Sequence, residues 1–189
     1  EDDKICFACN KDIEKSSKFK IYKICSEKDC NFHFHISAKE RINLIIDSGS
    51  FKEINKNLSS NFEQIAQEEL ENYDEKIKSD QFRTGLNEAV VSGTAKINGE
   101  DIIIIALDFG FLGGSMGLIV GEKIALAYEL AAKKKFPVIT IINSGGTRIQ
   151  EGVISLMQMS KTVSAANLLK NSNIHMLTIL CNHSTGQTM

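Results

Sequence analysis

The chain has 189 residues, 42% of them hydrophobic and 24% charged, and a formal net charge of −2. This length allows one domain with a sizeable core plus a small appended module, and the near-neutral charge excludes a general polyanion-binding function. No apolar stretch approaches the roughly 20 residues of a membrane span, and the start Glu-Asp-Asp-Lys lacks a signal or transit pattern. We therefore expect a soluble protein of a reducing compartment, without a membrane partner.

Two cysteine pairs mark the first segment, 1–36. They are Cys6-Phe-Ala-Cys9 and Cys25-Ser-Glu-Lys-Asp-Cys30, fifteen residues apart, close to the C-x2-C…C-x2-C layout of a zinc ribbon. The segment has too few apolar residues to form a stable core of its own, so it needs a cross-link such as a bound metal ion. The spacing predicts a structural zinc bound by Cys6, Cys9, Cys25 and Cys30, because a closed four-ligand site leaves no position for a substrate.

The second cysteine pair has four intervening residues rather than two, which leaves the fourth ligand open. His33 or His35 could replace Cys30. Both histidines lie in the alternating segment Phe32-His-Phe-His-Ile36, and we favour the interpretation that they face solvent while the phenylalanines pack. Lysines 18, 20 and 23 add local positive charge, and ribbons of this type can touch nucleic acid, but a solvated face is the interpretation we favour.

Residues 37–80 are predicted to form a helical connector. Ile42, Ile45 and Ile46 lie on one helical face over 37–47, Ser37 and Glu40 form a capping box, and Gly49 ends this helix. From residue 51 to 77 the periodicity is weak and the polarity high, which indicates a solvated helical stretch. A shift from polar to Ile-, Ala- and Gly-rich composition places the main domain over 81–189.

The main domain follows an α/β pattern. Strand-like runs over 89–97 and 101–108 are joined at Asn98-Gly99, a strong hairpin signal. A helix is predicted over 115–135, before Pro137, then a buried strand over 138–142, a helix over 148–169 and a buried strand over 174–180. The pattern implies right-handed crossovers and by itself fits either a Rossmann-like sheet or a crotonase superhelix.

Two glycine-rich turns each follow an apolar run and open a helical pattern. They are Phe111-Leu-Gly-Gly-Ser-Met-Gly117 and Ser144-Gly-Gly-Thr-Arg-Ile-Gln-Glu151. Bare backbone N–H groups at such helix starts bind anions. The turns therefore suggest a ligand that is an acyl-CoA or carries a phosphate.

Each of these residues also has a structural interpretation. Gly114, Gly117 and Gly121 are three and four residues apart and could let a helix pack closely on the sheet. Arg148 is one of only three arginines, which favours a planar, bidentate role toward an anion or toward a buried carboxylate such as Glu151. A helix-surface ion pair is the alternative.

The amino-acid sequences of the two turns resemble those of a known family. The strings FGFLGGSMGLIVGEKI and SGGTRIQEGVISLMQMSKT, behind a four-cysteine ribbon, closely resemble the β subunit of the bacterial and plastid acetyl-CoA carboxylase carboxyltransferase, from Cys6 to about Gly186. The resemblance implies an α/β fold in which the zinc ribbon is followed by the first half of a crotonase/ClpP-like ββα superhelix.

The resemblance also implies a reaction. In that family a carboxyl group passes from carboxybiotin, held on the biotin carboxyl carrier protein, to acetyl-CoA, giving malonyl-CoA for fatty acid synthesis. A carboxyltransferase α subunit completes an α2β2 assembly in the bacterial cytoplasm or plastid stroma. The biotin ureido nitrogen is thought to take the substrate proton, so no side-chain base is required. We expect the 189 residues alone to be inactive, because the family's second half-domain is absent from them.

Site residues follow position by position from the resemblance. The family's GGSMG and SGG-x-R turns, implied to line the acyl-CoA side of the pocket, match Gly113, Gly114, Gly117, Ser144, Gly145, Gly146 and Arg148. The family's D-P-T-x-G-G-V motif, whose paired glycines form an oxyanion hole, falls on the last residues. Gly186 and Gln187 stand at those glycines, so Gln187 departs from the pattern, as Asn182-His183 does at Asp-Pro.

Two alternatives remain open at this stage. One is the β subunit of another biotin-dependent acyl-CoA carboxylase or decarboxylase. The other is a degenerate, truncated paralogue that keeps the ribbon and acts as a scaffold or RNA-binding module, an interpretation to which Gln187 gives weight.

Overall fold

The computed structural model describes residues 5–59 and 70–188. They form two compact units, Glu1–Ile36 and Ser37–Met189.

The first unit is built around its cysteines. Isolated antiparallel bridges join Ile5 to Asp12 and Ile24 to His33, and the six-residue helix α1, Ser17–Tyr22, is capped by the Ser16 side chain. Among its described residues, 5–36, the buried core contains four, Cys6, Ile13, Phe19 and Cys25, with Phe34 packed against them. Half of that core is cysteine, which confirms that this segment has little apolar mass of its own.

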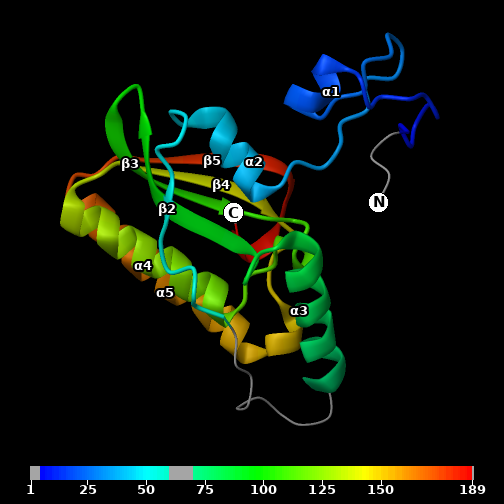
Figure 1. The fold of residues 1–189 in the computed structure, drawn as a ribbon. Helices are drawn as coiled ribbons and strands as arrows, with labels where there is room; N and C mark the ends of the chain where they lie inside the picture. Colours follow the sequence, from blue (N-terminus) through cyan, green and yellow to red (C-terminus); the bar gives the residue numbers. More distant parts are fainter. Residues whose placement is uncertain (1–4, 60–69, 189) are drawn as a thin grey trace. The chain divides into compact units, whose positions relative to one another are not determined.

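The second unit is a five-stranded mixed sheet (Figure 1). Strands β1 to β3 are antiparallel, and β3, β4 and β5 are parallel to one another, in the spatial order in which they occur in the chain. Ile103, Ile104 and Ile105 at its centre are fully buried. The strands are β1 (Lys52–Glu53), β2 (Val90–Ile97), β3 (Glu100–Leu107), β4 (Val138–Ser144) and β5 (Met176–Ser184).

Helices cover both faces of the sheet (Figure 1). Helix α2, Ala38–Ile45, packs on one face against β2 and β3, and α4, Leu118–Lys134, packs on the other. Helix α5, Val153–Asn171, lies along α4. This arrangement confirms the predicted α/β class.

Predictions that depended on a few neighbouring residues, such as the hairpin turn and the capping box, agree with the structure. Asn98 and Gly99 both have left-handed backbone, with φ of 51° and 84°, as a two-residue type I′ hairpin requires. Ser37 and Glu40 form the predicted capping box. The helix ends at Ile45, before the expected stop at Gly49, because the chain turns extended at Ile46.

Several predicted boundaries shift. The helix expected from residue 115 begins at Leu118, because Met116 bridges to Thr147 instead. The helix expected from residue 148 begins at Val153, after a short 3₁₀ turn η2, Ile149–Glu151, and a left-handed Gly152. The last strand continues beyond residue 180 to Ser184. In each case a tertiary pairing replaces what local periodicity favoured.

The solvated connector is the larger correction. Lys52 and Glu53 pair with β2 as an edge strand, and α3, Leu70–Thr84, buries Tyr73 and Ile77. The part of the connector over 60–69 lies outside the described residues. Helix α3 contains few apolar residues, so its polar sequence did not indicate that one face of the helix is buried.

None of the described helices combines the length and the apolar character that crossing a bilayer demands.

Candidate functional site

Three glycine-containing turns meet at the carboxyl ends of β3, β4 and β5. The first is the 3₁₀ turn η1, Leu112–Gly114, the second follows β4 at 145–146, and the third is η3, Gly186–Thr188. The Gly145 N–H donates to the Gly113 carbonyl at 2.8 Å, and the Met116 N–H donates to the Gly146 carbonyl at 2.7 Å. The Thr185 N–H reaches the Ser144 carbonyl at 3.1 Å. The structure thus joins the turns that the sequence singled out.

Gly114 fits only without a side chain. Its φ is +64°, and an added Cβ would lie 2.2 Å from the Asn143 carbonyl oxygen. The close approach lets the η1 turn rest directly on the end of β4.

We expect Gly114→Ala to destabilise the protein more than Gly49→Ala, a matched control. Both glycines have left-handed φ, but an added Cβ at Gly49 meets nothing within 4 Å. Each substitution costs about 1 to 2 kcal/mol of backbone strain, and Gly114→Ala adds about 1 to 3 kcal/mol of overpacking. Urea unfolding of both variants measures the difference. Equal losses would mean that the contact with Asn143 relaxes freely.

Arg148 lies at the centre of a buried ionic network. Its side chain is fully buried, and it forms a two-pronged ion pair with Glu88, with Nη2–Oε1 at 2.7 Å and Nη1–Oε2 at 3.0 Å. Nη1 also donates to Glu151 Oε1 at 3.2 Å and to the Tyr73 hydroxyl at 3.3 Å. Nε and Nη2 donate to the Ser115 hydroxyl and carbonyl. Every edge of the guanidinium therefore faces a protein partner.

Electrostatics favour this charged arrangement. Burial opposes the charge, but Glu88 and the neighbouring Tyr73 and Glu151 outweigh it and raise the pKa of Arg148 above its ordinary value. Burial, with help from Glu151, raises the pKa of Tyr73, so its hydroxyl keeps its proton and donates to Glu151 at 2.7 Å. A second buried cation, Lys123, lies near Glu88; burial lowers its pKa while Glu88 and Glu53 oppose that shift.

Glu151 also closes the amino end of α4. Its Oε2 accepts the Leu118 N–H at 2.5 Å, and a Cβ on Gly117 would lie 2.4 Å from Oε1. An added Cβ on Gly121 would similarly meet Gln158 of α5. These contacts favour the close-packing interpretation of Gly117 and Gly121.

Arg148 and Gly117 are both buried. Arg148 has the buried carboxylate partner that one of the predictions named, with Glu88 in addition. Sequence reasoning missed Glu88, Tyr73 and Ser115. The only signal for Glu88 was a lone acidic residue immediately before a buried strand, in Glu-Ala-Val-Val.

Gly113 and Gly186 differ from these residues in the hydrogen bonding of their backbone N–H groups. Within 5–59 and 70–188, no acceptor pairs with the backbone N–H of Gly113 or of Gly186. An added Cβ on Gly186 would be 3.6 Å from the Cα of Gly146, so the second and third turns touch. Gln187 stands in η3 directly after Gly186. Backbone N–H groups without a protein acceptor are the kind of donor that stabilises an oxyanion.

A stacked ring pair lies beside these turns. The rings of Phe109 and His183 are 4.5 Å apart at 20°, and His183 has a left-handed φ of 62°. The left-handed backbone and the contact with Phe109 together fix the position of His183 at the end of β5.

In the first unit, four sulfur atoms form a cluster suited to a metal ion. The Sγ atoms of Cys6, Cys9, Cys25 and Cys30 lie within 4.8 Å of one another. The Cys6–Cys30 and Cys9–Cys25 pairs are each 3.7 Å apart, matching the separation of about 3.8 Å for four sulfurs placed tetrahedrally at about 2.3 Å from zinc. Among the described residues no histidine joins this group, and His33 is exposed.

The thiols of the cluster influence one another. Burial opposes ionisation of Cys6, but backbone N–H groups of Ala8 and Cys9 and the neighbouring sulfurs bring its pKa to about 7. The Phe32 backbone favours the Cys30 thiolate, yet burial and the other three sulfurs raise the pKa of Cys30 to about 12. A metal cation at the centre of the cluster would offset the repulsion between four thiolates in so small a space.

The α/β sheet and its joined glycine turns define a carboxyltransferase-type fold, and the chain belongs to the carboxyl transferase domain family, whose model matches residues 36–188. The relatives identify the branch. The chain is 41% identical over 181 residues to the acetyl-coenzyme A carboxylase carboxyl transferase subunit beta of Desulforamulus reducens, covering 96% of this chain and 61% of that protein. It is 42% identical over 185 residues to the same subunit of Fusobacterium nucleatum, covering 96% of this chain and 58% of that protein.

A solved structure agrees with the fold. The transcarboxylase 12S structure with methylmalonyl-coenzyme A and methylmalonic acid bound is 25% identical, with a TM-score of 0.62, and the match covers 78% of this chain and 26% of that one. The predicted crotonase-like arrangement is thereby confirmed. The chain spans about 60% of the length of the curated relatives named above.

Proposed function

We propose that this chain forms the acyl-CoA side of a carboxyltransferase that moves a carboxyl group from carboxybiotin to acetyl-CoA, giving malonyl-CoA. The observation that carries the proposal is the junction of three glycine turns at one edge of the sheet, where the N–H groups of Gly113 and Gly186 have no acceptor among the atoms that the structure describes. The names of the relatives support the same reaction and the same acyl group.

The chain's own contribution is electrostatic. Carboxylation of acetyl-CoA requires an enolate next to the thioester, and preorganised N–H donors stabilise its oxygen. Gly113 and Gly186 are the donors we assign, and Gly114, Ser144, Gly145 and Gly146 fix the turns on which they lie. Carboxybiotin, when bound, supplies the carboxyl group and carries the difficult chemistry. We assign Arg148 to positioning these turns rather than to contact with CoA.

The partners follow from the same proposal. We propose a carboxyltransferase α subunit in an α2β2 assembly and a biotin carboxyl carrier protein, in a bacterial cytoplasm or a plastid stroma. We further propose that the four cysteines hold a structural zinc ion, because their donor set and spacing suit tetrahedral zinc.

The acyl group can be tested directly. Transfer of the carboxyl group should be measured with the natural-length protein and its α subunit, with acetyl-CoA and longer CoA thioesters in competition. Preference for a longer thioester would favour the alternative, another biotin-dependent acyl-CoA carboxylase or decarboxylase.

One observation favours a second candidate, a degenerate paralogue acting as a scaffold. Gln187 occupies the place of the second glycine in the family's oxyanion motif. If that glycine's geometry is needed, Gln187 misplaces one donor, a loss of about 3 to 4 kcal/mol in transition-state stabilisation.

We expect Gln187→Gly to leave malonyl-CoA formation unchanged or lower if the enzyme is functional. The comparison uses the natural-length protein in its complete complex. A rise of about a hundredfold or more would identify a degenerate site and contradict the proposed function. Gly99→Ala, at a left-handed turn distant from the site in the β2–β3 hairpin, serves as a control for nonspecific changes.

A further inference from the structure

One face of α3 is directed at the glycine turns. Tyr73, Ile77 and Asp80 are four and three residues apart, so they share a helical face, and all three are buried. Glu75 and Lys78 on other faces of the helix are exposed. A helix in a polar stretch that buries an aspartate and a tyrosine on one face has a specific partner there.

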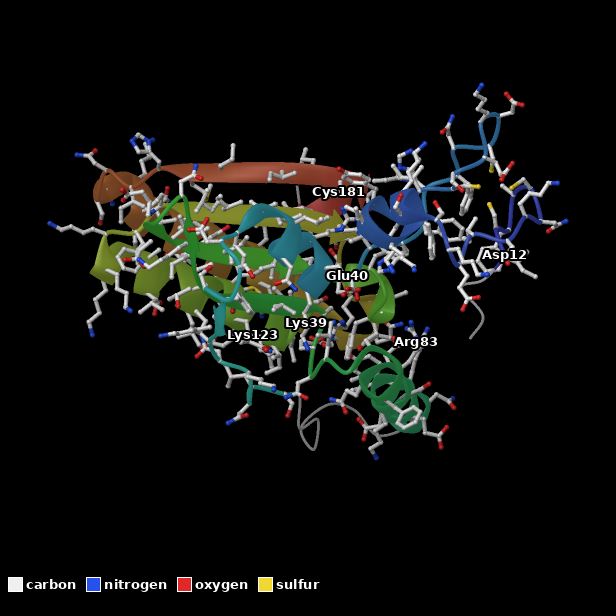
Figure 2. The ribbon with its side chains drawn as sticks, turned by 45° about the horizontal axis from the view of Figure 1, so that its top comes forward. Asp12, Lys39, Glu40, Arg83, Lys123 and Cys181 are labelled. Atoms are coloured by element: carbon white, nitrogen blue, oxygen red, sulfur yellow. The ribbon has the colours of Figure 1, made fainter. Side chains whose placement is uncertain are left out.

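Asp80 contacts the first glycine turn. Its Oδ2 accepts the Leu112 N–H at 2.8 Å, and its Oδ1 accepts from Arg83. The Arg83 guanidinium also donates to the Gly110 carbonyl, and Figure 2 shows Arg83 at the end of α3. The two side chains together hold both ends of the 110–112 segment.

The held segment is strained. Leu112 has a left-handed φ of 45°, a conformation that a branched, bulky residue adopts only when its surroundings impose it. Gly113 and Gly114 follow directly, also left-handed. The bond from Asp80 to the Leu112 N–H is therefore placed where it can impose that conformation.

Tyr73 extends the same face of α3 to the second turn. Its hydroxyl donates to Glu151 at 2.7 Å, and Glu151 closes α4 and pairs with Arg148. Both glycine-rich turns are thus held from one helix.

We propose that Asp80 is a positioning residue that holds the Leu112–Gly114 turn in the shape required for binding the acyl-CoA. α3 is then a brace for the site rather than a connector. The functional half of this inference rests on the proposed carboxyltransferase activity, whereas the contact itself can be tested without it.

The first experiment is hydrogen exchange on the 189-residue chain. Asp80→Ala should speed amide exchange over 110–116 by about fivefold or more, the effect of one lost hydrogen bond, with the β3 amides unchanged. Asp80→Asn keeps an acceptor oxygen and should stay near wild type, and Glu75→Ala is the exposed control on the same helix. Unchanged exchange over 110–116 in Asp80→Ala would overturn the proposal.

A second variant covers the case in which Asp80→Ala does not fold. Arg83 is more than half exposed, so Arg83→Ala leaves no buried cavity. It should also speed exchange over 110–112. Exchange at the wild-type rate over 110–112 in Arg83→Ala would overturn the proposal that Asp80 and Arg83 together hold this segment.

The activity measurement separates positioning from stability. In the natural-length complex, Asp80→Ala should raise the KM for acetyl-CoA by about tenfold or more, with rescue by Asp80→Asn. An unchanged KM together with faster exchange would overturn the positioning role. If the wild-type complex transfers no carboxyl group, the proposed function fails, and the exchange experiment alone decides the contact.

Discussion

Replacing Arg148 by methionine is expected to lower the free energy of unfolding of the Ser37–Met189 unit by about 3 to 5 kcal/mol. Methionine keeps much of the side-chain volume but removes the charge. Glu88 and Glu151 would then remain buried without their main cation, since the guanidinium supplies both their ion pairs. An uncompensated buried charge costs far more than the intact pair contributes.

Urea unfolding followed by circular dichroism measures the loss. Lys133→Met, at an exposed position on α4, is the control and should change stability by less than about 0.5 kcal/mol. Adding Glu88→Gln to Arg148→Met should recover part of the loss. A loss below about 1 kcal/mol in Arg148→Met would show that the buried network relaxes, for example toward Lys123.

Removing the metal is expected to unfold the first unit completely. Apparent binding free energies of structural zinc sites are about 10 to 16 kcal/mol at neutral pH, and in small modules this energy is the folding energy. Two of the four buried core residues are cysteines of the cluster, so little else can hold Glu1–Ile36 together. The Ser37–Met189 unit has its own large core and should stay folded.

Elemental analysis and NMR test this prediction. We expect about one zinc per chain and loss of signal dispersion for residues 5–36 on chelation or in Cys30→Ser, with the sheet resonances retained. His33→Ala is the matched control and should keep its zinc. Protein purified without chelator that contains no metal would contradict the site. Normal zinc in Cys30→Ser with loss in His33→Ala would assign the fourth ligand to the histidine.

The sequence predicted those features that depend only on residues close together in the chain. The Asn98-Gly99 hairpin and the Ser37–Glu40 capping box each depend on residues at most three apart. The glycine turns were found because their spacing is a local property of the chain. The four cysteines, in two short pairs, were likewise visible as a group.

Long-range partners could not be predicted in the same way. Arg148 and Glu88 are 60 residues apart in the chain, and Arg148 and Tyr73 are 75 apart. Whether Arg148 meets a ligand or a buried carboxylate depends on which of many acidic residues folding brings to it. The polar composition of α3 concealed its buried face for the same reason, because Asp80 resembles any surface aspartate until Leu112 lies against it.

The two edge strands of the sheet, β1 and β5, differ in how readily a further strand could pair with them. β1 has only two residues, both charged, Lys52 and Glu53, and so short and charged an edge resists the addition of another strand. β5 is nine residues long, without a charged residue or a proline, and Met176, Leu177 and Leu180 are exposed along it. β5 therefore lacks the features that protect the β1 edge, and we expect any further strand that pairs with this sheet to pair with β5 rather than with β1.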